Sequence, residues 1–175
     1  RSPATAESAG EFYANERGFA LRAGAVTVQA EPRFSGWDEL RAISLSQEKS
    51  PRRLLRIKGV EEYGFLPVES ISISPNPPTP EETKRAGGRF VAEINKKLAN
   101  SVQNDIFIYV HGYKVIFDNP ILVATELWHY LGYEGVFIAY AWPSTPKSLA
   151  YFADAETTTA SAYKLRLLLE YLAQE

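Results

Sequence analysis

Residues 105–113, which read Asp-Ile-Phe-Ile-Tyr-Val-His-Gly-Tyr, constrain the fold more than any other stretch of this chain. Five apolar residues run without interruption into His111 and Gly112. The run is too short to span a membrane, and its β-branched and aromatic residues favour a strand that is buried on both faces. Such strands lie in the middle of parallel sheets and need helices on both sides. The stretch therefore predicts an α/β fold.

The residues that follow predict a helix and a second buried strand. Asn119 and Pro120 are typical of a helix start. Gly135 then precedes another uninterrupted apolar run, residues 136–141. Together the two runs predict a strand–helix–strand unit. The apolar positions of the intervening helix are Ile121, Ala124, Trp128 and Leu131.

Further elements are expected on either side of this unit. Residues 23–30 read as a strand, and residues 68–74 end in the strict alternation of a strand with one wet face. Thr79, Pro80 and Glu82 form a strong helix start with a capping box. We expect this helix to break or restart at Gly87 and Gly88, because glycine weakens a helix interior by about 1 kcal/mol.

A last helix is expected near the end of the sequence. Residues 145–153 are predicted to form a loop over the carboxyl edge of the sheet, where α/β proteins place their ligands. Asp154 would cap the helix that follows. The expected buried face of this helix consists of Leu165, Leu168, Leu169 and Leu172.

Composition excludes several classes of function. The chain has 175 residues and is 45% hydrophobic, which suits one domain with a sizeable core. Its net charge of −2 argues against a nucleic-acid partner. The basic run at residues 49–58 fits the solvated face of an amphipathic strand. No apolar stretch reaches the roughly 18 residues that a membrane span requires.

Three groups of residues resemble a known family. His111, Gly112 and Tyr113 end one buried strand, and Trp142-Pro143-Ser144 ends the next; Tyr151 and Asp154 then lead into a helix. In this pattern the chain resembles the bacterial α/β-hydrolase family catalogued as domain of unknown function 900, over residues 88–175 and more weakly over 11–35. The resemblance implies a mainly parallel sheet flanked by helices. It also implies an esterase-like or lipase-like enzyme with a serine nucleophile, a histidine base and an acid.

The sequence departs from that pattern at the nucleophile. In α/β-hydrolases the serine lies in a G-x-S-x-G turn, with the acid and the histidine after it. The sequence contains no such turn, and its only histidines, His111 and His129, precede the place where it would lie. We therefore expect residues 11–175 to be the N-terminal portion of a single α/β-hydrolase domain, behind a flexible lead-in at residues 1–10. The sheet would be incomplete, ending before the strand that carries the nucleophile.

The triad would then come from outside this chain, either from a missing C-terminal half or from a second polypeptide, for example after cleavage near residue 175. Completed in this way, the protein is expected to hydrolyse small-molecule carboxylic esters, whereas this chain alone would be inactive. The alternative is a non-catalytic binding or scaffold module with the same fold. We expect no cofactor, and two histidines without a supporting carboxylate cluster are a poor metal-ligand set.

The resemblance assigns the oxyanion donors to the loop after the first buried strand. Tyr113 would donate its backbone N–H, with Lys114 as a possible second donor. His111 and Gly112 would shape the loop: Gly112 permits a sharp turn, and His111 holds it by hydrogen bonds rather than acting as a base. A plain strand-ending turn is the simpler reading of the same residues.

Aromatic residues are the candidate pocket. Trp142, Tyr151 and Phe152 could line an acyl or alcohol pocket, although core or lid packing explains them equally well. The aromatic segment around Arg17-Gly18 is predicted to pack near the mouth of the site, with ordinary strand packing as the alternative.

Two further side chains are poor catalytic candidates. Ser144 could be served by His111, but Pro143 before it and the absence of flanking glycines argue against a nucleophile turn. Asp154 is better explained as a helix cap than as a catalytic acid.

Overall fold

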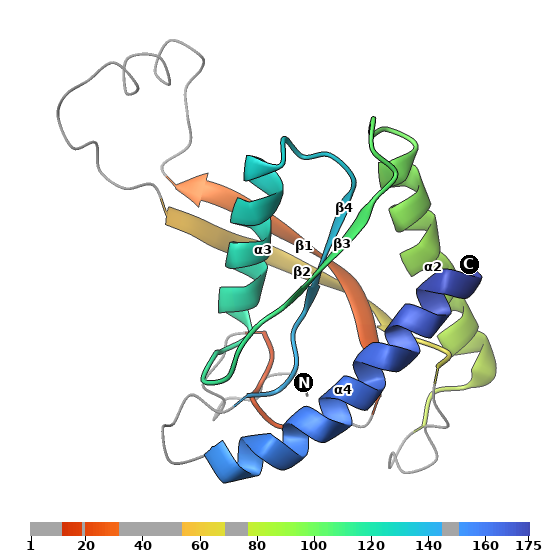
Figure 1. Ribbon diagram of the computed structural model, residues 1–175. Helices are drawn as coiled ribbons and strands as arrows, with labels where there is room; N and C mark the ends of the chain where they lie inside the picture. Colours follow the sequence, from red (N-terminus) through yellow and green to blue (C-terminus); the bar gives the residue numbers. More distant parts are fainter. Residues whose placement is uncertain (1–11, 19, 32–53, 69–76, 145–150) are drawn as a thin grey trace, which may run out of the picture.

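The structure is a computed structural model, and it describes residues 12–18, 20–31, 54–68, 77–144 and 151–175. Strands and helices alternate in its second half, so the expected α/β class is confirmed (Figure 1). The strands are β1 (Arg22–Glu31), β2 (Leu54–Phe65), β3 (Ile106–Val110) and β4 (Val136–Tyr140). The helices are α2 (Pro80–Leu98), α3 (Asp118–Tyr130) and α4 (Tyr151–Gln174).

Strands β1 and β2 form an antiparallel pair. Their register places Arg22 opposite Phe65 and Val26 opposite Val60, with two irregularities that shift the pairing along β1. The expected strand at residues 23–30 is confirmed. On β2, Arg56 and Lys58 are exposed and both pair with Glu31 across the hairpin, as expected for a solvated basic face.

Strands β3 and β4 form the expected parallel pair around helix α3. Val110 lies opposite Tyr140 at the carboxyl end of the pair. Gly135 has a φ of +67° at the entry to β4, and a Cβ there would lie 2.5 Å from the carbonyl oxygen of Asp105. Only glycine fits this position without strain, because it has no Cβ and tolerates a positive φ.

Two expectations about the sheet are wrong for the described residues. The sheet is not mainly parallel, because the strands form two separate pairs and one of them is antiparallel. Strand β3 is not buried on both faces: Ile106 is 36% exposed and Val110 is 45% exposed. The reason is that β3 pairs with β4 along one edge and has no neighbouring strand on the other within the part of the chain that the structure describes.

Helix α2 begins as predicted but does not break. Glu82 N–H donates to Thr79 Oγ1 at 3.2 Å and Thr79 N–H donates to Glu82 Oε2 at 2.7 Å, which completes the capping box. The helix runs through the two glycines because Gly87 is buried against other elements: a Cβ there would lie 2.5 Å from Tyr171 Oη and 3.0 Å from Pro67 Cδ. Close packing of α4 on α2 therefore offsets the weak helix propensity of glycine.

Helix α4 begins earlier than predicted, at Tyr151. Asp154 therefore lies inside the helix and is not the residue that precedes it, so the expected capping position is wrong. Leu168 is buried as expected, but Leu169 is 49% exposed, so that part of the predicted buried face is wrong. Most of the alternating stretch at residues 68–74 and of the predicted loop at 145–153 lies outside the described residues.

The core joins the hairpin, β4 and two helices. Phe90 of α2, Tyr140 of β4 and Leu168 of α4 are among its buried residues. Tyr140 also donates its hydroxyl to the Ser161 carbonyl oxygen at 2.7 Å, which fastens β4 to α4. None of the described helices is both long enough and apolar enough to cross a membrane.

Candidate functional site

The loop at residues 111–117 follows β3, and residues 141–144 follow β4 at the same edge of the parallel pair. Because Val110 and Tyr140 are in register, the two segments leave the sheet side by side. In parallel α/β sheets this carboxyl edge is where ligands bind. The sequence placed its oxyanion loop and Trp142 here, and the structure brings both together.

His111 and Trp142 form the first set of contacts between the two segments. The Trp142 indole N–H donates to the His111 carbonyl oxygen at 2.7 Å. The His111 ring stacks on the indole with centroids 5.2 Å apart and planes inclined by 4°. His111 Nε2 lies 3.0 Å from the Trp142 carbonyl oxygen, and Nδ1 lies 2.6 Å from that of Gly112.

This geometry suits a structural role for His111. Both ring nitrogens face carbonyl oxygens, which only accept hydrogen bonds, so a nitrogen that donates to one of them presents no lone pair to a substrate. The side chain is also buried. His111 therefore holds the loop in place and is poorly arranged to act as a base.

Ser144 forms the second set of contacts between the two segments, and the sequence analysis did not predict this role. Its hydroxyl accepts from Val115 N–H at 2.9 Å and donates to the Val115 carbonyl oxygen at 2.9 Å. The residue is 0% exposed. With its proton engaged and no access to solvent, Ser144 is not placed to act as a nucleophile. The sequence signal that could have suggested this connection is a hydroxyl a few residues after a buried strand, near a loop whose backbone groups need hydrogen-bond partners.

The tip of the loop carries the predicted oxyanion donors. Tyr113 is 62% exposed, and Lys114 beside it is exposed as well. Lys114 has a φ of +64°, so Lys114 is the residue of this turn that adopts the left-handed backbone conformation. The steric reason expected for Gly112 is not observed, because a Cβ there would meet nothing within 4 Å. The assignment of Tyr113 and Lys114 as donors stays a prediction.

The three predicted pocket aromatics have different positions. Trp142 is buried and lies in the wall of a cavity. Tyr151 and Phe152 lie in the first turn of α4 rather than in a loop, and their side chains are outside the described part of the structure. Their proposed contact with substrate therefore stays a prediction.

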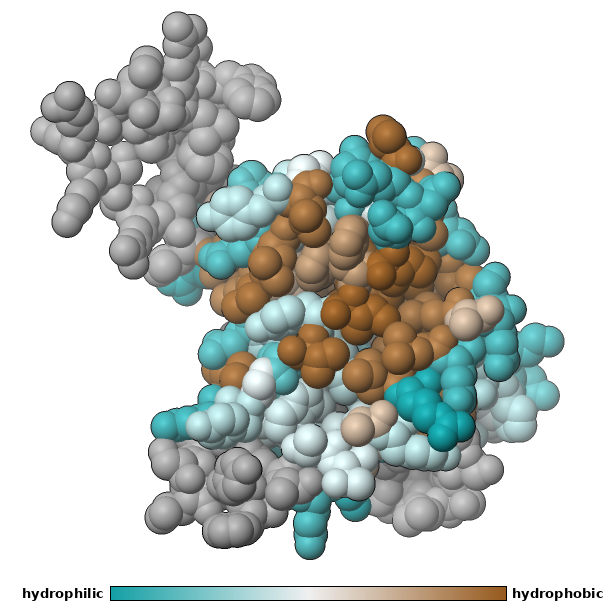
Figure 2. Space-filling view, viewed as in Figure 1, coloured by the Kyte–Doolittle hydropathy of each residue, from teal (hydrophilic) through white to brown (hydrophobic). Residues whose placement is uncertain are grey.

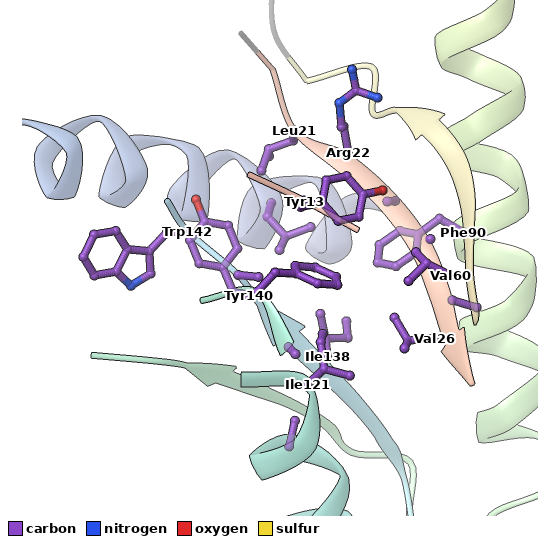
Figure 3. Close-up of a pocket in the computed structure, with 18 of the residues that line it drawn as sticks. Tyr13, Leu21, Arg22, Val26, Val60, Phe90, Ile121, Ile138, Tyr140 and Trp142 are labelled. Atoms are coloured by element: carbon purple, nitrogen blue, oxygen red, sulfur yellow. The ribbon is translucent and has the colours of Figure 1, made fainter. Parts of the chain in front are cut away.

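The cavity itself was missed by the sequence analysis. It has a volume of about 350 Å³ and lies between the β1–β2 hairpin and β4, with α2, α3 and α4 around it. Figure 3 shows Val26 and Val60 of the hairpin on one side and Ile138 of β4 and Ile121 of α3 on the other. The cavity is partly open at the surface of the protein, and apolar atoms make up most of its wall.

A polar network holds the N-terminal segment at the cavity. The Tyr13 hydroxyl donates to Glu62 of β2, and Glu62 also pairs with Arg22 of β1. Burial raises the pKa of Tyr13 well above its usual range, and the hydrogen bond to Glu62 acts in the same direction. The Tyr13 ring packs on Phe117, at the end of the loop that follows β3, with centroids 4.6 Å apart. The segment around Arg17-Gly18 therefore borders both the cavity and the loop, and its place at the mouth of a substrate site stays a prediction.

No group of three or more His, Cys, Asp or Glu side chains that could hold a metal ion occurs among the described residues. His129, the second histidine, lies on the exposed side of α3, where its Nδ1 is 2.8 Å from Tyr133 Oη. It is therefore far in the fold from the carboxyl edge, at the opposite end of α3.

Comparison with known proteins gives one match. Residues 88–175 match the model of a family described as "Alpha/beta hydrolase of unknown function (DUF900)". These residues contain half of the chain and all of β3, α3, β4 and α4. No curated protein and no solved structure matches the chain.

Proposed function

Because this chain belongs to the DUF900 family of alpha/beta hydrolases, we propose that it supplies the oxyanion loop and part of the substrate pocket of a serine esterase that acts on small-molecule carboxylic esters. One observation carries the proposal. The loop after β3 is fastened to the end of β4 at two points, by His111 with Trp142 and by Ser144 with Val115. A loop fixed in this way can hold backbone N–H groups in place before a reaction begins.

Such fixed donors are what ester hydrolysis requires. When a serine hydroxyl attacks the ester carbonyl carbon, its proton passes to a histidine and the carbonyl oxygen becomes an oxyanion. The Tyr113 N–H, with that of Lys114 as a possible second donor, would stabilise this negative charge. The histidine then protonates the departing alcohol. Water next attacks the acyl carbon and gives a proton to the histidine, which forms a second oxyanion. As this oxyanion collapses, the histidine returns the proton to the serine oxygen and the acid is released.

In this proposal the serine, the acid and the histidine lie outside residues 1–175, on a C-terminal portion of the protein or on a second polypeptide. Among the described residues β3 has a strand on only one edge, which supports such a partner, since unpaired strand edges accept further strands. Figure 2 shows apolar residues gathered over α3 and β3. The exposed hydrophobic side chains of these two elements include Ile106 and Val110 of β3 and Val123 and Leu127 of α3. A strand added to β3 would cover this surface.

The proposal is tested with a fluorophosphonate, which reacts with activated serines, followed by intact-mass analysis. We expect a polypeptide other than the 19.6 kDa chain, or a longer form of it, to gain the probe mass, and this chain alone to remain unlabelled. Denatured protein is the control for nonspecific labelling. Absence of label and of ester hydrolysis in the natural full-length protein would contradict the proposal and favour the non-catalytic binding module.

The donor assignment has its own test in the labelled, active protein. Tyr113→Pro removes the backbone N–H, whereas Tyr113→Ala removes the side chain and keeps the N–H. We expect the proline variant to lose about 100-fold to 1000-fold in kcat, the effect of deleting one oxyanion donor. The alanine variant should lose much less. Equal losses in the two variants would refute a backbone role for Tyr113.

A further inference from the structure

We propose that the cavity between the β1–β2 hairpin and β4 binds the hydrocarbon chain of an anionic amphiphile, a long-chain carboxylate, with the guanidinium of Arg17 beside the charged group. The proposal does not rest on ester hydrolysis, because a bound carboxylate needs no catalytic residue. It uses the walls of the cavity and the charges that line it.

The walls suit a hydrocarbon chain. They are formed largely by aliphatic and aromatic side chains, among them Val26 and Val60 of the hairpin, Phe90 of α2 and Ile138 of β4 (Figure 3). The volume of about 350 Å³ lies within the range of small-molecule sites. If a methylene group occupies about as much space as a water molecule, roughly ten of them fit. Apolar walls of this kind favour an apolar ligand over water.

The charges select the head group. Four cationic side chains line the cavity against one carboxylate, Glu93, although the chain as a whole has a net charge of −2. Three of the cations are already engaged. Arg22 pairs with Glu62, Lys164 donates to the Gly18 carbonyl oxygen at 3.0 Å, and Lys97 lies over the Trp128 ring at 5.0 Å.

Arg17 differs from these three. It is exposed, it borders the cavity, and it forms no hydrogen bond or ion pair with any other residue in the described ranges. A guanidinium at the rim of an apolar space is complementary to a carboxylate whose hydrocarbon chain lies inside, since it can donate two parallel hydrogen bonds to the carboxylate. This position therefore favours an anionic amphiphile over a neutral or cationic one.

The first test measures binding of dodecanoate to this chain by calorimetry, below the concentration at which the ligand forms micelles. We expect one site per chain. Val26→Phe places a larger side chain in the cavity and should weaken binding at least about tenfold, the effect of displacing part of the chain from an apolar site. Val102→Phe is the matched control, because Val102 is exposed and does not line the cavity.

A second cavity variant replaces the first one if the first does not fold. Ala139→Leu fills the opposite wall, from β4, and should weaken binding in the same way if Val26→Phe does not fold. Circular dichroism and thermal unfolding establish which variants are folded. Undiminished binding to a folded cavity variant would overturn the proposed site, as would failure of dodecanoate to bind the unchanged chain.

The second test concerns the head group. Arg17→Gln should weaken dodecanoate binding about threefold, the size expected for a solvent-exposed ion pair, and leave dodecanol binding unchanged. Arg85→Gln, an exposed arginine of α2 that does not line the cavity, is the control. If Arg17→Gln keeps the full preference for dodecanoate over dodecanol, the assignment of Arg17 is wrong. These binding measurements do not depend on whether a fluorophosphonate labels the protein, so the two proposals can fail separately.

Discussion

Replacing Ser144 by alanine should release the loop after β3 from the end of β4. The substitution deletes a fully buried hydroxyl that both accepts from and donates to the backbone of Val115, at 2.9 Å each. Each hydrogen bond contributes about 1 kcal/mol net, and a buried group that loses its partner costs about 1–3 kcal/mol. We therefore expect the free energy of unfolding to fall by roughly 2–4 kcal/mol.

Urea unfolding followed by circular dichroism measures this loss, and hydrogen exchange locates it. The Val115 amide should exchange faster in the variant, because its hydrogen bond to the serine is gone. Thr125→Val is the control: the Thr125 hydroxyl donates to the Ile121 carbonyl oxygen within helix α3 and joins no separate elements. We expect that control to change stability by less than about 0.5 kcal/mol.

The reasoning about the loop would be refuted by a Ser144→Ala variant with the stability and the Val115 exchange rate of the unchanged chain. Such a result would mean that the stacking of His111 on Trp142 holds the loop by itself. In the active protein, a freed loop should also lower kcat more than it raises KM, because preorganised donors act on the transition state.

Two further predictions concern glycines and an acidic side chain. Gly135→Ala should destabilise the chain by about 1–3 kcal/mol, because Gly135 has a positive φ and a Cβ there would meet the Asp105 carbonyl oxygen. Gly88→Ala, which has open space around it, should stabilise helix α2 by up to about 1 kcal/mol, and thermal unfolding measures both effects. The hydrogen bond from Ser101 holds the pKa of Glu134 below its ordinary value. Its stabilising effect is therefore present above the unfolded-state pKa and is lost as the pH falls through the lower folded-state pKa. A Glu134→Gln variant should lack this part of the acid dependence of the urea midpoint, and identical pH profiles would contradict the assignment.

Local sequence patterns predicted the structure correctly where contacts between neighbouring residues determine it. Thr79 and Glu82 predict a helix start, and both hydrogen bonds of the capping box are present. The two apolar runs predict strands, and they pair in parallel around α3. The same patterns wrongly predicted a helix break at Gly87. Helix propensity describes an isolated helix, whereas in the folded chain Tyr171 and Pro67 approach Gly87 so closely that a side chain there would clash.

The candidate site was predictable in outline and not in detail. The sequence placed the loop at residues 111–114 and Trp142 at one edge of the sheet, since parallel strands end together. It could not show that Ser144 fastens that loop, because the bond joins residues 29 positions apart. The roles of Tyr113 and Lys114 came from resemblance to a family, and the structure adds a fixed loop that supports them.

The sequence by itself determined the class of the fold and the strand–helix–strand order of residues 106–140. These follow from hydrophobic periodicity and from capping residues, which act within a few positions of one another. The tertiary structure alone decided that β3 has a strand beside it on only one edge among the described residues, that Ser144 holds the loop, and that a cavity separates the hairpin from β4. Each of these depends on distances between residues far apart in the chain, and such distances are fixed only when the elements pack together.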